Sequence, residues 1–463
     1  MTVMTRNVYL PRLEGLSREE IDALQGRKLV RQVRRLHATN PFYRRLWDAA
    51  GVDIDTIRTR ADVNRLPFTS KRDFMADQAA EPPYGSRLGV PAVEVGEITE
   101  TSGTSGKGRE LHGHTVQDMH LRGQMTAVAW AWAGLQRDDI GIFHIPASNS
   151  ASLYTMLRGI RAVGRLPYLV GHLGFEERLD LMRRLGVNAM YATPSGLNGM
   201  AALCDKLGIV PADAFPDLKF VVVSAESWPV EWVERMQDYW HTKITEVYGS
   251  TQLNAAFGAA CCERGAVADG QRGNLHMFEW TQLYEVVDPE TGEPVAPGEP
   301  GELVITHLDK QASPLVRYRS ADRVTRHPYG RCACGRQYDV IEAGTIGRVD
   351  DMFKVKGQSI WPSELESLIF SHAEVDEFQA RAYIGAKGRD EIELRFSVHH
   401  GTGNQRQAQL VDDLRRKLKE VTDVTFAVSL VQADDLPHFT SPDKKARRWS
   451  DDRHTGLATG VAS

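Results

Sequence analysis

Short, fully apolar segments alternate along this chain with longer segments of helical periodicity. Residues 220–225 read FVVVSA, whereas residues 27–37, 175–185 and 232–239 place apolar side chains at helical spacing. A short apolar run between helices is typical of a strand that is buried on both faces, as in a sheet with helices on both sides. The alternation therefore predicts a layered α/β domain.

A second, smaller unit is predicted by the C-terminal part of the chain. Residues 390–398 (DEIELRFSV) alternate apolar and polar side chains like a half-buried strand, and residues 404–421 carry an apolar stripe at helical spacing. The stripe consists of Leu410, Val411, Leu414, Leu418 and Val421. We expect a large α/β domain over 1–347, a small α+β domain over 348–451 and a flexible tail over 452–463.

Composition limits the partners of the chain. Of 463 residues, 42% are hydrophobic and 25% charged, the proportions of a folded globular protein. Lys and Arg number 56 and Asp and Glu 61, so there is no basic excess to bind nucleic acid or an anionic membrane. The longest uncharged apolar stretch, residues 125–135, is shorter than the roughly 20 residues of a membrane-spanning helix. Because the N-terminus also lacks a secretory-signal pattern, we expect a cytoplasmic protein.

The segment 98–110, ITETSGTSGKGRE, combines glycines, hydroxyl side chains and a lysine. Glycines let backbone amides approach phosphate oxygens, hydroxyls donate hydrogen bonds to them, and a lysine offsets their charge. The segment lacks the G-x-x-x-x-G-K-[ST] order of P-loop NTPases, and its alternative interpretation is a flexible Ser/Gly linker. It predicts a phosphate-binding loop formed by Thr101, Ser102, Gly103, Thr104, Ser105, Gly106 and Lys107.

TSGTSGKG within this segment resembles the phosphate-binding motif of the adenylate-forming superfamily, which includes acyl-CoA synthetases, luciferases and the adenylation domains of peptide synthetases. Four further segments are similar, in the same order, to motifs of its phenylacetate-CoA ligase branch. They are SAESWP at 224–229, VYGSTQ at 247–252, VRYRSADRV at 316–324 and GRVDDMFKVKGQSIWPSELE at 347–366. Five motifs in sequence are specific, whereas each alone is weak.

The resemblance implies an ATP-dependent, AMP-forming acid–thiol ligase. Such an enzyme activates a carboxylic acid, here expected to be aromatic, as an acyl-adenylate and passes the acyl group to coenzyme A. The small domain would rotate about Asp350 between the two steps, bringing Lys445 to the phosphoryl group and then the face containing Gly357 to coenzyme A. In SPDKKARRW the single lysine of the family aligns with Lys445, and Lys444 takes a place where glycine is common.

The same motifs imply the residues of the nucleotide and acid sites. Asp322 would accept hydrogen bonds from both ribose hydroxyls, a geometry that a carboxylate supplies, and Arg348 would reach ribose or phosphate. ATP contacts are also implied for Ala225, Glu226, Tyr248, Gly249, Ser250 and Thr251. The acid pocket is implied to include His144, Tyr154, Ser224 and Ala256. For His144 the alternative is a position in the hydrophobic core.

Gln252 is the one departure from the motifs that affects the chemistry. The superfamily's Tyr-Gly-Ser-Thr-Glu ends in a carboxylate that helps to hold Mg²⁺, whereas this chain ends the motif in an amide. An amide oxygen can ligate Mg²⁺ but brings no negative charge to a hard cation that favours carboxylates. Gln252 is therefore expected to bind Mg²⁺ less well than the family glutamate.

Five cysteines in a chain of this length do not suggest a disulfide framework. Some members of the phenylacetate-CoA ligase branch hold a structural zinc, and the resemblance implies Zn²⁺ ligation by Cys262, His276, Cys332 and Cys334, a closed tetrahedral set. The alternative is free thiols with a core histidine. Cys204, on an apolar helical face, is expected to be a packing residue.

Two alternative functions remain open from the sequence. One is an adenylate-forming enzyme that uses another acid or nucleophile, for example nitrite in aryl diazotisation. The other is a non-catalytic nucleotide sensor, in which the loss of the magnesium carboxylate marks a dead enzyme. The expected partners are thus a small carboxylic acid, ATP and coenzyme A, and a homodimer is left open.

Overall fold

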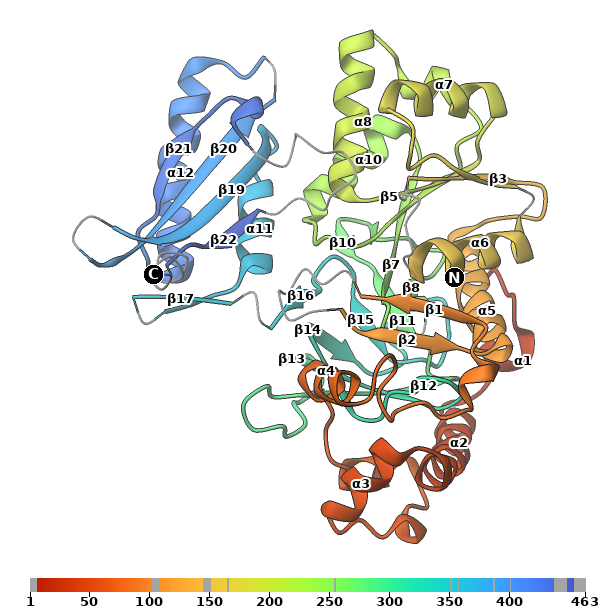
Figure 1. Ribbon diagram of the computed structural model, residues 1–463. Helices are drawn as coiled ribbons and strands as arrows, with labels where there is room; N and C mark the ends of the chain where they lie inside the picture. The colour runs from red at the N-terminus through yellow and green to blue at the C-terminus, as the bar shows by residue number, and fades with distance from the viewer. Residues whose placement is uncertain are drawn as a thin grey trace, which may run out of the picture.

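The computed structural model describes residues 6–101, 109–144, 151–164, 166–253, 255–349, 352–356, 358–385, 388–399, 401–436 and 448–453. It consists of a large N-terminal unit and a smaller C-terminal unit, drawn in blue in Figure 1. The predicted fold class, a large layered α/β domain followed by a small α+β domain, is confirmed.

A mixed sheet of twelve strands forms the centre of the described part of the large unit, in the order β12-β13-β14-β15-β11-β8-β7-β6-β5-β3-β4, with β16 paired to β14. Its parallel strands are β3 (Ile140–Phe143), β4 (Leu166–Leu169), β5 (Ala189–Ala192), β6 (Phe220–Val223) and β7 (Lys243–Ser250). Its antiparallel strands are β8 (Ala255–Cys261), β11 (Asn274–Met277), β12 (Gln282–Val287), β13 (Pro300–His307), β14 (Tyr318–His327), β15 (Val340–Glu342) and β16 (Gly347–Arg348). The predicted strand FVVVSA is β6.

Helices cover both faces of the parallel strands, which explains the unbroken apolar runs in the sequence. On β6, Val221 and Val223 belong to a core shared with α7, α8 and α10, whereas Phe220 and Val222 belong to a core shared with α5 and α6. The helices are α5 (Val116–Ala133), α6 (Ala151–Val163), α7 (Phe175–Leu185), α8 (Pro194–Leu207), α9 (Pro211–Ala214) and α10 (Val230–Trp240). The predicted helices at 175–185 and 232–239 are α7 and part of α10.

Local sequence signals set the ends of these helices. At α8 the Thr193 hydroxyl accepts from the Gly196 amide, Pro194 follows as the first helical residue, and Gly208 ends the helix in the left-handed conformation with φ +66°. A capped N-terminus, a proline at the first position and a C-terminal glycine satisfy the backbone groups that a helix end leaves unpaired. The N-terminal cap fixes where the loop between the carboxyl end of β5 and α8 ends.

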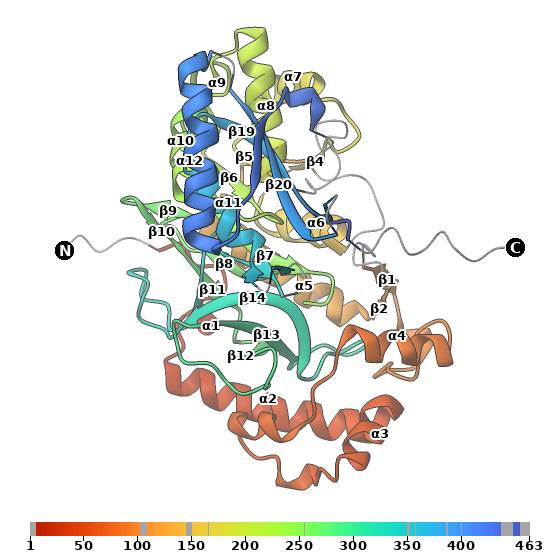
Figure 2. The ribbon, with the colours of Figure 1, turned by 90° about the vertical axis from the view of Figure 1, so that its left-hand side faces the viewer.

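The N-terminal helices pack against the antiparallel part of the sheet, with α2 and α3 below β12 and β13 in Figure 2. They are α1 (Pro11–Glu14), α2 (Arg18–Thr39), which contains the predicted helix 27–37, α3 (Pro41–Ala49) and α4 (Lys71–Ala80). Two hairpins complete the large unit, β1 (Glu97–Glu100) with β2 (Leu111–His114), and β9 (Val267–Ala268) with β10 (Gln271–Arg272). No helix in the described ranges has both the length and the apolar character needed to cross a bilayer.

The C-terminal unit has a four-stranded sheet in the order β21-β20-β19-β22 with two helices packed against it. Its elements are β17 (Phe353–Val355), β18 (Gln358–Ile360), α11 (Pro362–Phe370), β19 (Val375–Ile384), β20 (Asp390–Val398), α12 (Asn404–Thr422), β21 (Ala427–Leu430) and β22 (Trp449–Asp451). The strand at 390–398 and the helix at 404–421 agree with prediction. Of the predicted apolar stripe, Val421 is instead 57% exposed, because it lies in the last turn of α12.

The two units meet beside α10 and α11. Ser227, at the turn before α10, donates to the Glu366 carboxylate of α11 at 2.5 Å, and the Arg323 guanidinium stacks 4.8 Å from the centre of the Trp361 ring. The expected domain boundary at 347/348 falls within β16, whose Arg348 is paired in register with Asp322 of β14.

Candidate active site

Predicted site residues from three segments of the chain lie at the carboxyl edge of the parallel strands. The chain runs from β3 outward to β4 and then returns to β5 on the other side of β3, so the strand order reverses between β3 and β5. Ligands of α/β sheets bind at such a reversal, outside the carboxyl ends of the strands. His144 directly follows β3, Ser224 follows β6, and Tyr248 lies in the C-terminal half of β7.

Asp322, the predicted ribose anchor, is held by two of the other predicted residues. The Tyr248 hydroxyl donates to its Oδ2 at 2.5 Å, and Nη1 of Arg348 donates to its Oδ1 at 2.7 Å. Burial, together with the charge of Asp322, raises the pKa of Tyr248 well above its usual value, so the phenol stays protonated and remains a donor. Each carboxylate oxygen keeps acceptor capacity for a further hydroxyl, as a ribose contact requires.

A break in strand pairing shapes the end of β7. The register of β7 with β8 shifts between Tyr248 and Ser250, so that Gly249 alone lies opposite three residues of β8, 256–258. Bulges turn the strand and re-aim its side chains, and they are frequent beside active sites. β7 ends at Ser250, so Thr251 is the first residue beyond the strand, at the edge where the other predicted contacts lie.

The segment 224–229, which by resemblance to the family motif is expected to contact adenine, forms a tight turn after β6 that we call the adenine turn. Ala225 adopts φ +80°, a left-handed conformation that is costly for a residue with a Cβ atom and that persists only where neighbouring contacts hold it. Glu226 supplies such contacts, because its carboxylate accepts from the Ser195 hydroxyl at 2.6 Å and from the Ser195 amide at 3.1 Å. The turn is therefore attached to the N-terminus of α8.

Glu226 also faces the small domain. Its carboxylate lies 3.7 Å from Nη1 of Arg448, which is buried and forms a bidentate pair with Glu377 of β19 at 2.7 and 2.9 Å. Sequence reasoning did not single out Arg448, although it stands in the same basic segment as Lys445. It links the strand that follows the predicted catalytic lysine to the adenine turn.

The predicted acid-pocket residues have different surroundings. His144 donates its backbone amide to Tyr191 at 3.0 Å, and its Nδ1 lies 3.4 Å from Nη1 of Arg178. Burial and the Arg178 charge lower the pKa of His144 to about 3, so the imidazole is neutral at physiological pH. Ser224 is buried, whereas Tyr154 on α6 is 38% exposed. The Ala256 side chain lies outside what the structure describes.

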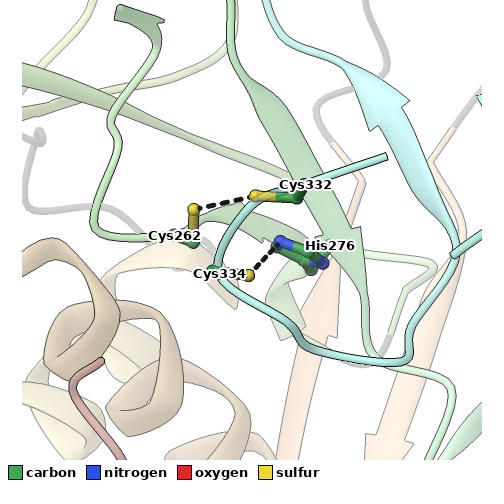
Figure 3. A group of neighbouring side chains, drawn as sticks. All are labelled: Cys262, His276, Cys332 and Cys334. Carbon is green, nitrogen blue, oxygen red and sulfur yellow. Dashed lines mark hydrogen bonds between the residues drawn. The ribbon is translucent and has the colours of Figure 1, made fainter. Parts of the chain in front are cut away.

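The four predicted zinc ligands come together in one buried cluster (Figure 3). Their potential ligand atoms all lie within 4.8 Å of one another, with 3.3 Å between the sulfurs of Cys262 and Cys332 and 3.2 Å between Cys334 Sγ and His276 Nε2. Zinc–sulfur bonds of about 2.3 Å in a tetrahedron separate two sulfurs by roughly 3.8 Å. Small side-chain shifts would therefore make this set a closed tetrahedral site.

Several predicted residues lie outside the described part of the chain. They are Ser102, Gly103, Thr104, Ser105, Gly106, Lys107, Asp350, Gly357 and Lys445. Thr101 is described, is buried, and exchanges hydrogen bonds with Glu110 across the base of the predicted phosphate loop. Glu110, the last residue of the glycine-rich segment, was not singled out from the sequence.

Comparison with known proteins shows the family to which the chain belongs. Residues 100–308 match the model of the AMP-binding enzymes, and residues 357–453 match the C-terminal domain of AMP-binding enzymes. A phenylacetate-coenzyme A ligase from Thermus thermophilus is 30% identical over 96% of this chain and 99% of its own length. The chain belongs to the phenylacetate-CoA ligase branch of the adenylate-forming enzymes. The family expected from the five motifs is therefore confirmed.

Other comparisons agree with this family. A phenylacetate-coenzyme A ligase from Escherichia coli is 28% identical over 94% of this chain and 96% of its own length. The fold is that of a 2-hydroxyisobutyryl-CoA ligase in the postadenylation state, with a TM-score of 0.85 and 23% identity over 98% of this chain and 94% of that one. These findings support an AMP-forming ligase that activates an acid as an acyl-adenylate and transfers it to coenzyme A.

Proposed function

We propose that this enzyme activates an aromatic carboxylic acid with Mg²⁺-bound ATP and forms its coenzyme A thioester. The observation that carries the proposal is the Tyr248–Asp322–Arg348 group at the carboxyl edge of a sheet whose sequence motifs are those of phenylacetate-CoA ligases. The relatives named for phenylacetate favour an aryl acid, and a neutral imidazole at His144 suits a pocket for an uncharged ring.

In the first step, a carboxylate oxygen of the acid attacks the α-phosphorus of ATP, and the bond to pyrophosphate breaks. Asp322 and Tyr248 would hold the ribose, Thr101 and the loop after it the phosphates, and Lys445 would stabilise the charge on the transferring oxygens. Mg²⁺, when bound, neutralises phosphate charge. The amide oxygen of Gln252, the residue after Thr251, is a ligand atom that suits Mg²⁺. In the second step the thiol sulfur of coenzyme A attacks the acyl carbon, and AMP leaves.

The orientation of the small domain supports a role in the first step. The TM-score is 0.85 with the 2-hydroxyisobutyryl-CoA ligase in its postadenylation state and 0.69 with that ligase in its thioesterification state. In this chain the contacts of Arg448 and Glu366 direct the small domain toward the adenine turn at Glu226 and Ser227. Thioester formation would need these contacts to break and the domain to rotate.

We also propose that Cys262, His276, Cys332 and Cys334 hold one structural Zn²⁺. Three sulfurs and one imidazole nitrogen form a closed set, with no place for a substrate, and all four residues are buried. The cluster joins the end of β8, β11 and the loop before β15, so a bound ion would connect segments about 70 residues apart in the chain.

A pyrophosphate-release screen would test the function. Arylacetic, benzoic and short hydroxy acids would each be offered with ATP and Mg²⁺, with and without coenzyme A. We expect release with an aryl acid and thioester only when coenzyme A is present. Release that requires nitrite and an arylamine would select the diazotising alternative, and ATP binding without release for any acid would select the nucleotide sensor.

Asp322→Asn should weaken ATP binding by about 1.5–3 kcal/mol, the range for a hydrogen bond to a charged group. The substitution replaces one acceptor oxygen by an amide that cannot accept, so a ribose hydroxyl or Arg348 loses its partner. The ATP dissociation constant, measured by calorimetry, checks this. Asp339→Asn, at a buried aspartate that pairs with Arg326, is the matched control and should leave ATP affinity unchanged. Equal ATP affinity for Asp322→Asn and the unsubstituted enzyme would contradict the ribose role.

A further inference from the structure

Glu110 is a fully buried carboxylate at the base of the predicted phosphate loop. Its side chain has no exposed surface. Its backbone carbonyl accepts from the Thr101 amide and its amide donates to the Thr101 hydroxyl, each at 3.0 Å. Burying a charge without partners is costly. Burial alone would raise the pKa of Glu110, but the contact with His112 and the charges of Arg87 and Lys71 lower it, so the carboxylate is ionised.

Three donors from three different segments surround this carboxylate. Oε2 accepts from Gln252 Nε2 at 3.3 Å and lies 3.0 Å from His112 Nε2, and Oε1 accepts from the Tyr318 hydroxyl at 3.2 Å. Gln252 ends the Tyr-Gly-Ser-Thr-Gln motif, and Tyr318 begins β14, which also contains Asp322. Glu110 thus joins the phosphate-loop segment to Gln252, two residues after β7, and to the first residue of β14.

The contact with Glu110 fixes the direction of the Gln252 amide. An ionised carboxylate only accepts hydrogen bonds, so the Gln252 NH₂ group must face it and the carbonyl oxygen must face the other way. The carbonyl oxygen is the atom that could ligate Mg²⁺. Family members carry a negative charge on the last residue of this motif. In this chain that charge is on Glu110, whose side chain contacts Gln252.

We propose that Glu110 is a positioning residue for Gln252 that carries the negative charge relocated from the family's metal-binding glutamate. This inference rests on the proposed function. Glu110 and Gln252 then form a pair that carries one negative charge. Either position can hold the carboxylate, but not both. A second carboxylate at position 252 would lie about as close to Glu110 as the present 3.3 Å contact, and two like charges at that separation cannot both ionise without a large penalty.

If the two residues act as a unit, each of two single substitutions should weaken Mn²⁺ binding. Glu110→Gln keeps the shape but removes the charge, and it should raise the dissociation constant of Mn²⁺ at least about tenfold. Gln252→Glu should do the same and also lower the thermal midpoint, because it places two carboxylates together. Mn²⁺ binding would be followed by electron paramagnetic resonance with α,β-methylene-ATP present, and unfolding would be measured without metal. Glu279→Gln, which neutralises a buried carboxylate bonded to Arg18, is the control and should not change Mn²⁺ affinity.

The double variant Glu110→Gln/Gln252→Glu decides the inference. It restores one charge with the hydrogen bond reversed, so Mn²⁺ affinity and the magnesium dependence of pyrophosphate release should return to within about threefold of the original enzyme. Additive losses in the double variant, or tighter Mn²⁺ binding by Gln252→Glu alone, would overturn the inference. An original enzyme that releases no pyrophosphate with any acid would instead contradict the proposed function, and Mn²⁺ binding would still test the pair.

Discussion

Lys445→Ala should lower the rate of acyl-adenylate formation by at least about 10²-fold, the loss expected when a group that stabilises transition-state charge is removed. Thioester formation from a supplied acyl-adenylate should be nearly unchanged, because the lysine serves one orientation of the small domain only. ATP–pyrophosphate exchange measures the first half-reaction, and coenzyme A thioester formation measures the second. The described chain resumes at Arg448, three residues later, beside Glu226 of the adenine turn.

Lys444→Ala is the matched control for this prediction. It removes an equal charge from the neighbouring position, where the family commonly has glycine, and should have a milder effect on both half-reactions. Equal loss of both half-reactions in Lys445→Ala, or a larger loss in Lys444→Ala, would refute the assignment of the catalytic lysine.

Cys334→Ser should remove zinc and cause the largest loss of stability among these substitutions. A metal that binds only the folded state stabilises it by about 4 kcal/mol when its free concentration is 1,000 times the dissociation constant. Serine is a poor zinc ligand, so this stabilisation is lost and the thermal midpoint falls. Elemental analysis of protein purified without chelator should give one zinc per chain for the original protein and much less for the variant.

The catalytic rate of the variant distinguishes a structural zinc from a catalytic one. The rate per folded molecule should change little in Cys334→Ser, because the ligand set is closed and has no place for a substrate. Cys204→Ser, at a buried cysteine of α8 outside the cluster, should keep its zinc. Original protein without zinc, or Cys334→Ser that retains it, would remove the metal site.

Local sequence patterns were sufficient to predict the family and most of the helices and strands discussed above. Apolar runs predict strands buried on both faces because water is excluded from both, and β6 is such a strand. The apolar stripe of α12 is correct at Leu410, Leu414 and Leu418, which are buried, but wrong at Val421. Periodicity fixes which side of a helix a residue occupies, whereas burial in the last turn depends on what packs there.

The sequence by itself determined which residues belong to the nucleotide motifs, since their order along the chain is a linear property. It also showed that Gln252 is neutral where the family has a negatively charged glutamate. Only the tertiary structure decided which residue carries a negative charge beside Gln252. That residue is Glu110, which is 142 residues away in the chain and reaches Gln252 because the β1–β2 hairpin lies beside the central sheet. Likewise, the spacing of Cys262, His276, Cys332 and Cys334 left free thiols as an alternative. The fold brings these four side chains together from the end of β8, from β11 and from the loop before β15. Contacts between distant segments depend on packing, which no local pattern encodes.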